Sequence, residues 1–319
     1  MSDPTRIVFM GTPDFAVATL DALIADGQEV VAVVTAPDRP AGRGRQLRAS
    51  AVKQRALELG LPVLQPERLK DPAFAEALDG LDADLFVVVA FRMLPEVVWS
   101  KPRLGTINLH GSLLPAYRGA APINWAVING EKETGVTTFR IRHEIDTGDM
   151  LLQDTIQVGP DASAGEVHDR LMHIGAQLMV RTVHGLTEGS LHATPQVIDP
   201  MHPPPGAPKL NADNTQVFFD RPSSKVHDLI RGLSPYPGAW CTWTHGDGRT
   251  HHLKLLRSAR SELPVHGPPG ALFVEDDRLF VACSDRPLEI LELQAEGRKR
   301  MVAADFLRGT RSIAGSRLA

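Results

Sequence analysis

The chain has little cysteine, and this excludes two kinds of structure. Cys241 and Cys283 are the only cysteines among 319 residues, and no Cys-x-x-Cys pair occurs. The sequence therefore predicts neither a disulfide framework nor a zinc site, and its cysteine usage fits a reducing compartment.

Long apolar runs and a targeting leader are also missing. No stretch approaches the eighteen or so apolar residues of a membrane-spanning helix. The first residues, Met-Ser-Asp-Pro-Thr-Arg, lead directly into an apolar strand without a charged and then apolar leader. We therefore expect a cytoplasmic protein that does not contact a membrane.

The dinucleotide fingerprint G-x-G-x-x-G is absent, although the surrounding pattern is of the right class. An apolar strand over Arg6–Met10, a helix beginning near Asp14 and a second strand over Val30–Val34 form a βαβ unit. Right-handed crossover then predicts a parallel, Rossmann-like sheet. Because Gly11 stands alone in the first turn, no nicotinamide cofactor is expected.

Basic residues are not in excess, since the formal net charge is −4, but they are unevenly distributed. From Lys209 onward the chain has 16 Lys and Arg and 13 Asp and Glu, a net charge of +3. The first 208 residues therefore carry a net charge of −7. Six basic residues and no acid lie between Arg39 and Arg55. A basic patch on an acidic body is compatible with an RNA partner.

The length and the apolar content of 43% predict a globular protein with two domains. We place the first domain at 1–198, a stiff proline-rich linker at 199–208, and the second domain at 209–319. After Trp240 the sequence shows several short strands of alternating polarity, each bounded by Gly, Pro or Asp. Such strands predict a small β-barrel.

The stretch from Ile107 to Met150 carries the polar groups best placed for chemistry. Asn108 and His110 are two residues apart on a short strand, so both side chains point to one side. A Gly-bounded turn with Asp146 could return a carboxylate to the imidazole. Together the three groups suit acyl transfer to an amine, because the amide and imidazolium can stabilise an oxyanion and the carboxylate can orient the His and take a proton.

Two alternatives apply to these residues. Each of them alone is more typical of a turn or cap than of catalysis. A metal site built from His110, His143 and Asp146 is conceivable, but acyl transfer from an activated donor needs no Lewis acid, and we expect no metal.

The combined string is more specific than its parts. Asn108-x-His110-x-Ser112-Leu-Leu-Pro115-x-Tyr-Arg-Gly-Ala-Ala-Pro122, followed by Thr134-Gly-Val-Thr and Asp146-Thr-Gly-Asp, resembles the core of the folate-dependent formyltransferases. The resemblance implies an α/β catalytic domain with a Rossmann-like parallel sheet, followed by a small OB-like β-barrel domain that binds tRNA. It also implies transfer of formyl from 10-formyltetrahydrofolate, the cosubstrate, to the α-amino group of methionyl-initiator tRNA.

Individual roles follow from the same resemblance. Asn108, His110 and Asp146 are the expected catalytic residues. The expected folate-binding residues are Ser112, Leu113, Leu114 and Pro115, although the same four residues could simply form a structural turn.

The loop over 37–48 follows the second strand and is rich in Gly, Pro and Arg, which predicts a mobile surface loop without regular structure. It looks like the insertion with which tRNA-modifying members of the family engage the acceptor end. The expected tRNA contacts are Arg43, Gly44, Arg45 and Lys209. A solvated basic turn is the alternative.

Two other functions remain open from the sequence. A sugar-nucleotide or other small-amine formyltransferase would share Asn108, His110 and Asp146. An RNA-binding protein that has lost activity would keep the fold alone. We expect a monomer.

Overall fold

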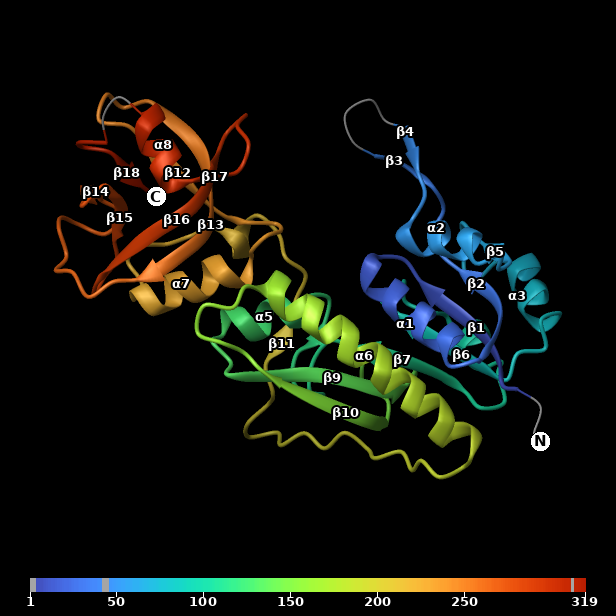
Figure 1. Ribbon diagram of the computed structural model, residues 1–319. Coiled ribbons are helices and arrows are strands. Elements are labelled where there is room, and N and C mark those ends of the chain that lie inside the picture. The colour runs from blue at the N-terminus through green and yellow to red at the C-terminus, as the bar shows by residue number, and fades with distance from the viewer. Residues whose placement is uncertain (1–3, 42–45, 311–312) are drawn as a thin grey trace. The chain divides into compact units, whose positions relative to one another are not determined.

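The structure is a computed structural model that describes residues 4–41, 46–310 and 313–319 (Figure 1). The chain forms two compact units. Unit 1 contains residues 1–122, 135–156 and 168–206, and unit 2 contains residues 123–134, 157–167 and 207–319. The last change of unit, between Gly206 and Ala207, lies within the proline-rich stretch. The domain limits at 198 and 209 stay a prediction.

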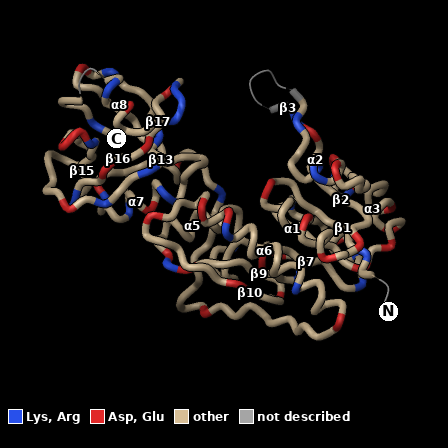
Figure 2. The backbone as a smooth tube through the Cα atoms, in the orientation of Figure 1, with Lys and Arg blue, Asp and Glu red and all other residues tan. Residues whose placement is uncertain are grey.

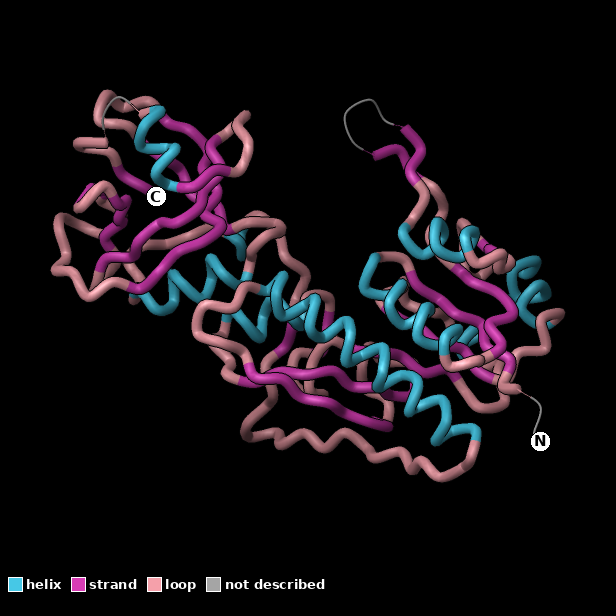
Figure 3. Tube along the Cα trace, viewed as in Figure 1, coloured by secondary structure: helices cyan, strands magenta, loops and turns pink. Residues whose placement is uncertain are grey.

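Unit 1 is built on a mixed, mostly parallel sheet of seven strands (Figures 1 and 3). The strand order is β10 (Met150–Gln157), β9 (Glu133–Arg140), β7 (Thr106–His110), β6 (Leu85–Val89), β1 (Arg6–Gly11), β2 (Glu29–Val34) and β5 (Val63–Leu64). The pairs from β7 to β5 are parallel, and β9 runs antiparallel to β7. The five residues of β6 are all buried, as expected for a strand covered on both faces. The predicted parallel α/β fold is confirmed.

Helices lie between these strands or follow the last of them in the chain. They are α1 (Asp14–Ala25), α2 (Ala51–Glu58), α3 (Pro72–Asp79), α4 (Glu96–Trp99) and the long α6 (Ala164–Thr187). The Oγ of Ser163 accepts the N–H of Glu166, and the Glu166 carboxylate accepts the N–H of Ser163, which is a capping box. Further along α6, a Cβ on Gly175 would lie 2.8 Å from Leu109 Cδ2, so this glycine lets α6 approach β7.

The loop over 37–48 differs from the prediction. Strands β3 (Arg39–Ala41) and β4 (Gln46–Arg48) pair in antiparallel register, with Pro40 opposite Leu47. A two-stranded ribbon has only edge strands, and an edge tolerates a proline at a position where no ladder N–H is required. The prediction of a loop without regular structure was therefore wrong for these flanks.

Unit 2 contains a second sheet, which is antiparallel in each pairing observed between its strands. Its strand order is β14 (Leu272–Glu275), β15 (Arg278–Ala282), β16 (Pro287–Ala295), β13 (Thr250–Arg260), β12 (Ala239–Thr244) and β18 (Arg317–Leu318), with β17 (Met301–Val302) beside β16. One isolated bridge between Ala271 and Arg317 joins the two ends of this order. Such a curled sheet suits a partly open OB-like barrel.

Smaller elements complete the chain. They are β8 (Arg118–Gly119), α5 (Pro122–Ile128), β11 (Gly206–Ala207), the 3₁₀ turn η1 (Asp213–Thr215), α7 (Ser223–Gly232) and α8 (Ala303–Gly309). Among the described residues, no helix combines the length and the apolar character that a membrane crossing requires.

Candidate active site

Strand β7 presents the first two predicted catalytic residues. Asn108 stands in register with Val88 of β6 and Phe139 of β9, and His110 stands opposite Thr137 of β9. Residues two apart in a strand share a face, so the amide and the imidazole project to the same side of the sheet. The side-chain Oδ1 of Asn108 is buried and has no hydrogen-bond partner among the described residues, which leaves it free to contact a substrate.

The imidazole of His110 is held by a backbone carbonyl. Its Nε2 lies 2.9 Å from the carbonyl oxygen of Tyr117, and the residue is only 6% exposed. A carbonyl only accepts hydrogen bonds, so Nε2 carries a proton. Phe139 packs edge-on against the ring at a centroid distance of 6.4 Å. The ring is therefore fixed in orientation, and Nδ1 is the nitrogen left for chemistry.

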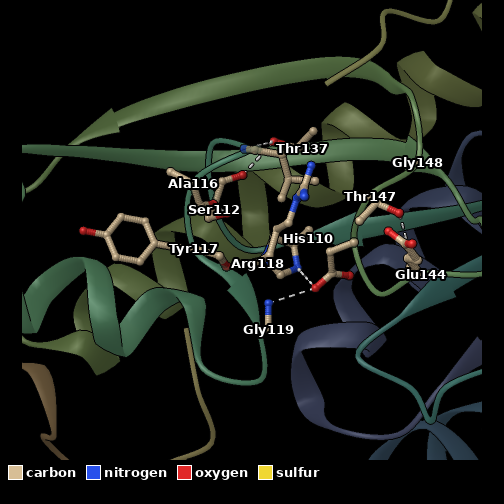
Figure 4. A network of polar contacts seen from close by, with 12 residues as sticks. His110, Ser112, Ala116, Tyr117, Arg118, Gly119, Thr137, Glu144, Thr147 and Gly148 are labelled. Atoms are coloured by element: carbon tan, nitrogen blue, oxygen red, sulfur yellow. Dashed lines mark hydrogen bonds and ion pairs between the residues drawn. The ribbon is translucent and has the colours of Figure 1, made fainter. Parts of the chain in front are cut away.

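Asp146 faces that nitrogen. Its Oδ2 lies 3.7 Å from His110 Nδ1 and accepts the backbone N–H of Gly119 at 3.0 Å. Figure 4 labels His110 and Gly119, whose dashed lines meet at one carboxylate oxygen. Asp146 has φ +54°, a left-handed conformation that Asp tolerates better than most residues. In the same turn, a Cβ on Gly148 would lie 1.6 Å from the Arg140 carbonyl oxygen, so only glycine fits there. The turn thus returns the carboxylate to the imidazole.

The distance between these two groups refines the expected role of Asp146. At 3.7 Å the pair is close enough for strong electrostatic interaction but longer than a hydrogen bond. The Tyr117 carbonyl, rather than the carboxylate, fixes which ring nitrogen carries the proton. Sequence reasoning missed this contact, because a backbone carbonyl leaves no signal in the residue type.

The loop of predicted folate-binding residues is stabilised by hydrogen bonds within the loop and to Thr137. Ser112 is fully buried and its Oγ donates to the Ala116 carbonyl at 2.6 Å. Thr137 Oγ1 donates to the Ser112 carbonyl and accepts the N–H of Leu114. The Leu114–Pro115 peptide is cis. The Ser112 hydroxyl is therefore engaged within the loop, and a folate role for Ser112, Leu113, Leu114 and Pro115 stays a prediction.

Arg92 lies in the segment that follows β6. Arg92 donates to the carbonyls of Pro66 and Glu67 at 2.8 and 3.2 Å, and its guanidinium lies 5.4 Å from the centroid of the Phe91 ring. Burial, together with the nearby charge of Arg39, lowers the pKa of Arg92. The guanidinium thus fastens two segments of unit 1.

Three of the four predicted tRNA contacts, Arg43, Gly44 and Arg45, lie outside the described residues. The fourth, Lys209, is exposed in unit 2, and its carbonyl accepts the side-chain amide of Asn214 at 3.0 Å.

Unit 2 has a hollow that the sequence did not predict. This C-terminal hollow has a volume of about 1050 Å³, and Trp243, His245, His251, Arg298, Lys299 and Phe306 are among its lining residues. Trp243 and His245 stack at a centroid distance of 3.7 Å. The Trp243 Nε1 and His245 Nε2 atoms are buried without a hydrogen-bond partner within the described residues.

The rim of the C-terminal hollow is basic. Burial, together with the charge of Arg249 and with His251, lowers the pKa of His245. The backbone beside β17 is blue in Figure 2, where Arg298, Lys299 and Arg300 precede this strand. Among the described residues, Arg298 and Lys299 make no ion pair, whereas Arg300 pairs with Glu292. Aromatic rings beside unpaired cations favour binding of single-stranded nucleic acid.

Comparisons with known proteins agree with this arrangement. The family model "Formyl transferase" matches residues 5–183, and "Formyl transferase, C-terminal domain" matches residues 209–311. Methionyl-tRNA formyltransferase of Parabacteroides distasonis is 50% identical over 314 residues, covering 97% of each chain. The enzyme of the same name from Bacteroides fragilis is 49% identical, covering 95% of this chain and 94% of the relative.

Solved structures share the fold at low identity. The sugar 3N-formyltransferase WlaRD gives a TM-score of 0.63 at 15% identity, covering 93% of this chain and all of that one. HypX from Aquifex aeolicus, in complex with tetrahydrofolic acid, gives 0.64 at 17% identity over 95% of this chain and 46% of that one.

Proposed function

Because the chain belongs to the formyltransferase family, and within it groups with the methionyl-tRNA formyltransferases, we propose that it formylates the α-amino group of methionyl-initiator tRNA. The formyl donor is 10-formyltetrahydrofolate, and the product is N-formylmethionyl-tRNA for translation initiation. One observation carries the proposal: His110 and Asp146 face each other at the end of the strand that also holds Asn108.

The first step forms a bond between the substrate amine and the formyl carbon. The α-amine of an aminoacyl ester is less basic than that of a free amino acid, so a neutral, nucleophilic fraction exists near pH 7. Attack pushes negative charge onto the formyl oxygen. The amide N–H of Asn108 stabilises this oxyanion, and so does the Nδ1–H of His110 in the imidazolium form, which carries a proton on each ring nitrogen.

The second step breaks the bond from the formyl carbon to N10 of the folate. One proton has to leave the attacking amine, and one has to reach N10. Asp146 accepts the first, directly or through water, and Nδ1 of His110, between Asp146 and the substrate, delivers the second. Nε2 takes no part, because it remains hydrogen-bonded to the Tyr117 carbonyl.

The folate lies, in this proposal, against the loop from Ser112 to Pro115. With the Ser112 hydroxyl engaged by Ala116, backbone groups of the loop make the contacts. Gln153 supports the loop from β10, since its Nε2 donates to the Leu114 carbonyl and to Thr137 Oγ1. Within the described residues, no three His, Cys, Asp or Glu side chains cluster as metal ligands do.

The tRNA contacts in the proposal come from both units. Arg43, Gly44 and Arg45 engage the acceptor end, where a planar guanidinium can pair with phosphate and stack on unpaired bases. Lys209 and the C-terminal hollow contact the body of the tRNA. The protein acts as a monomer in the cytoplasm.

A sugar-nucleotide formyltransferase is the alternative function, and it is not favoured. The chain is 45 to 50% identical to methionyl-tRNA formyltransferases over nearly its whole length, but only 15% identical to the sugar 3N-formyltransferase WlaRD.

The test supplies purified protein with 10-formyltetrahydrofolate and three acceptors in parallel: methionyl-initiator tRNA, the same tRNA uncharged, and an amino-sugar nucleotide. Folate deformylation and formyl on the acceptor are measured together. We expect equal amounts of tetrahydrofolate and N-formylmethionyl-tRNA, with no transfer to the other two. Preferential transfer to the amino-sugar nucleotide, or none to the charged tRNA, would overturn the proposal.

A further inference from the structure

An extended segment between α6 and unit 2 contacts the candidate active site through one glutamine. Gln196 Nε2 donates to the carbonyl of Asp146 at 2.8 Å and to that of Gly148 at 2.7 Å. Its Oε1 accepts two hydrogen bonds from Arg118, at 3.0 Å from Nε and 2.5 Å from Nη2. One side-chain amide therefore uses both of its ends on the two loops that meet at the carboxylate.

These contacts bear on the position of the carboxylate. Asp146 adopts a left-handed conformation, so the direction of its side chain depends on what holds its backbone. Gln196 ties down that backbone at Asp146 and two residues later. Through Arg118 it also holds the residue next to Gly119, whose N–H donates to Asp146 Oδ2. Gln196 therefore holds both the backbone of Asp146 and, through Arg118, the loop whose Gly119 N–H donates to the carboxylate.

The same segment holds the other half of the pair. The carbonyl of Pro205 accepts the N–H of Tyr117 at 2.6 Å, and the Tyr117 carbonyl is the acceptor facing His110 Nε2. At its start the segment is pinned to β10, because Thr194 and Met150 exchange two backbone hydrogen bonds of 2.8 Å.

Burial does not explain these contacts. Nearly all residues from 192 to 206 are exposed, and Val197, next to Gln196, is 83% exposed. The segment therefore adds little to the apolar core of unit 1. Its composition is that of a linker, yet its hydrogen bonds reach the backbone of Asp146 and the backbone of Tyr117, whose carbonyl contacts His110.

We propose that the segment 194–205 positions the catalytic pair, and that Gln196 is a positioning residue that acts on Asp146. Gln196 touches neither substrate. It keeps the carboxylate aimed at Nδ1 of His110, so its removal lowers the rate of formyl transfer without weakening substrate binding. The inference rests on the function proposed above.

Two substitutions test it. Gln196→Ala removes all four hydrogen bonds, and Gln196→Met removes them while keeping the length of the side chain. We expect kcat to fall about 10- to 100-fold in both, as for a catalytic group displaced by about 1 Å, with KM for methionyl-tRNA and for folate within about twofold of wild type. Val197→Ala, in the same segment, is the control and keeps the wild-type kcat.

A double-mutant cycle separates positioning from general stability. In an Asp146→Asn background, Gln196→Ala should lower kcat less than twofold further, because its effect passes through the carboxylate. An equal loss in both backgrounds, or a wild-type kcat for both single variants, would overturn the inference. An inactive wild-type protein would instead overturn the proposed function.

Discussion

Nδ1 of His110 lies 3.7 Å from Oδ2 of Asp146, although the two residues belong to different segments of unit 1. The strand β7 ends at the imidazole, and the turn after β9 returns the carboxylate to it. On the other side of the ring, the Tyr117 carbonyl occupies Nε2. The only ring nitrogen that can exchange a proton with a substrate therefore stands beside the only carboxylate that approaches it within the described residues.

Replacing Asn108 tests the stabilisation of the oxyanion. Asn108→Ala removes a neutral amide whose Oδ1 has no hydrogen-bond partner among the described residues, so folding should be little affected. By analogy with other oxyanion donors, we expect a loss of about 2 to 4 kcal/mol of transition-state stabilisation. Steady-state kinetics would show this as a lower kcat with KM for both substrates nearly unchanged. Turnover close to that of wild type would reject this role for Asn108.

Charge on the rim of the C-terminal hollow should govern tRNA binding. Arg298→Ala combined with Lys299→Ala removes two cations that make no ion pair among the described residues, so no partner is left unpaired. We expect a higher KM for methionyl-tRNA, an unchanged KM for folate, and a salt dependence of tRNA binding that is shallower by about two in slope.

The matched control for that pair is Arg221→Ala. Arg221 is also an exposed arginine of unit 2, lies 5.7 Å from the centroid of the Phe218 ring, and does not line the hollow. Its substitution should leave the salt dependence unchanged. If it weakens tRNA binding as much as the pair does, the effect belongs to net charge and not to the hollow.

A buried histidine should make unit 2 sensitive to acid. Burial lowers the pKa of His227. The hydrogen bond to the Pro160 carbonyl opposes this shift, the charges of Arg231 and Arg260 add to it, and Asp161 opposes it more weakly. The unfolded chain then binds the proton more readily than the folded chain. Stability is therefore fully present above the ordinary histidine pKa of 6.5 and is lost as the pH falls below it towards the lowered folded value.

The measurement compares the melting temperature of wild type and His227→Gln at pH 7.5 and 5.5. Gln can keep hydrogen bonds to Ser258 and to the Pro160 carbonyl, which His227 now contacts at 3.0 and 3.1 Å, but it has no charge to gain. We expect a smaller loss of melting temperature on acidification in the variant. Identical losses would show that other groups account for the acid sensitivity.

Both cysteines should be unreactive in the folded protein. Burial raises the pKa of Cys241 to about 12, and burial together with the charge of Asp285 raises that of Cys283 to about 12. At pH 8 only about one thiol in ten thousand is then ionised, and the thiolate is the reactive form. A colorimetric thiol reagent should detect neither thiol in the native protein and both thiols after unfolding in guanidinium. Rapid labelling of native protein would contradict this.

Much of the fold follows from local sequence patterns. The strand from Arg6 could be predicted because it is an uninterrupted apolar run. The start of the helix Asp14–Ala25 could be predicted from the Gly-Thr-Pro turn before it, although Pro13 holds the N-cap position and no side chain caps this helix. Strand β14, Leu272–Glu275, was not predicted, because four residues carry too little alternation to stand out. The hairpin of β3 and β4 was missed because its proline was taken as a breaker.

The site was predicted only as far as side-chain chemistry reveals it. The approach of Asp146 to His110 could be expected, since a glycine-bounded turn after the next strand returns the chain to the same sheet edge. The roles of the Tyr117 carbonyl and of Gln196 could not. Backbone acceptors have no residue signature, and Gln196 lies in a segment whose composition indicates only a linker.

The most direct measurement is the single-turnover rate of formyl transfer from 10-formyltetrahydrofolate to methionyl-initiator tRNA by Asp146→Asn. Asn keeps the size of the side chain and can still accept the N–H of Gly119, but it cannot take the amine proton. The pairing of His110 with Asp146 predicts a rate lower by about 10²- to 10⁴-fold, with folate and tRNA binding retained. A rate within about twofold of wild type would contradict the central role of this pair.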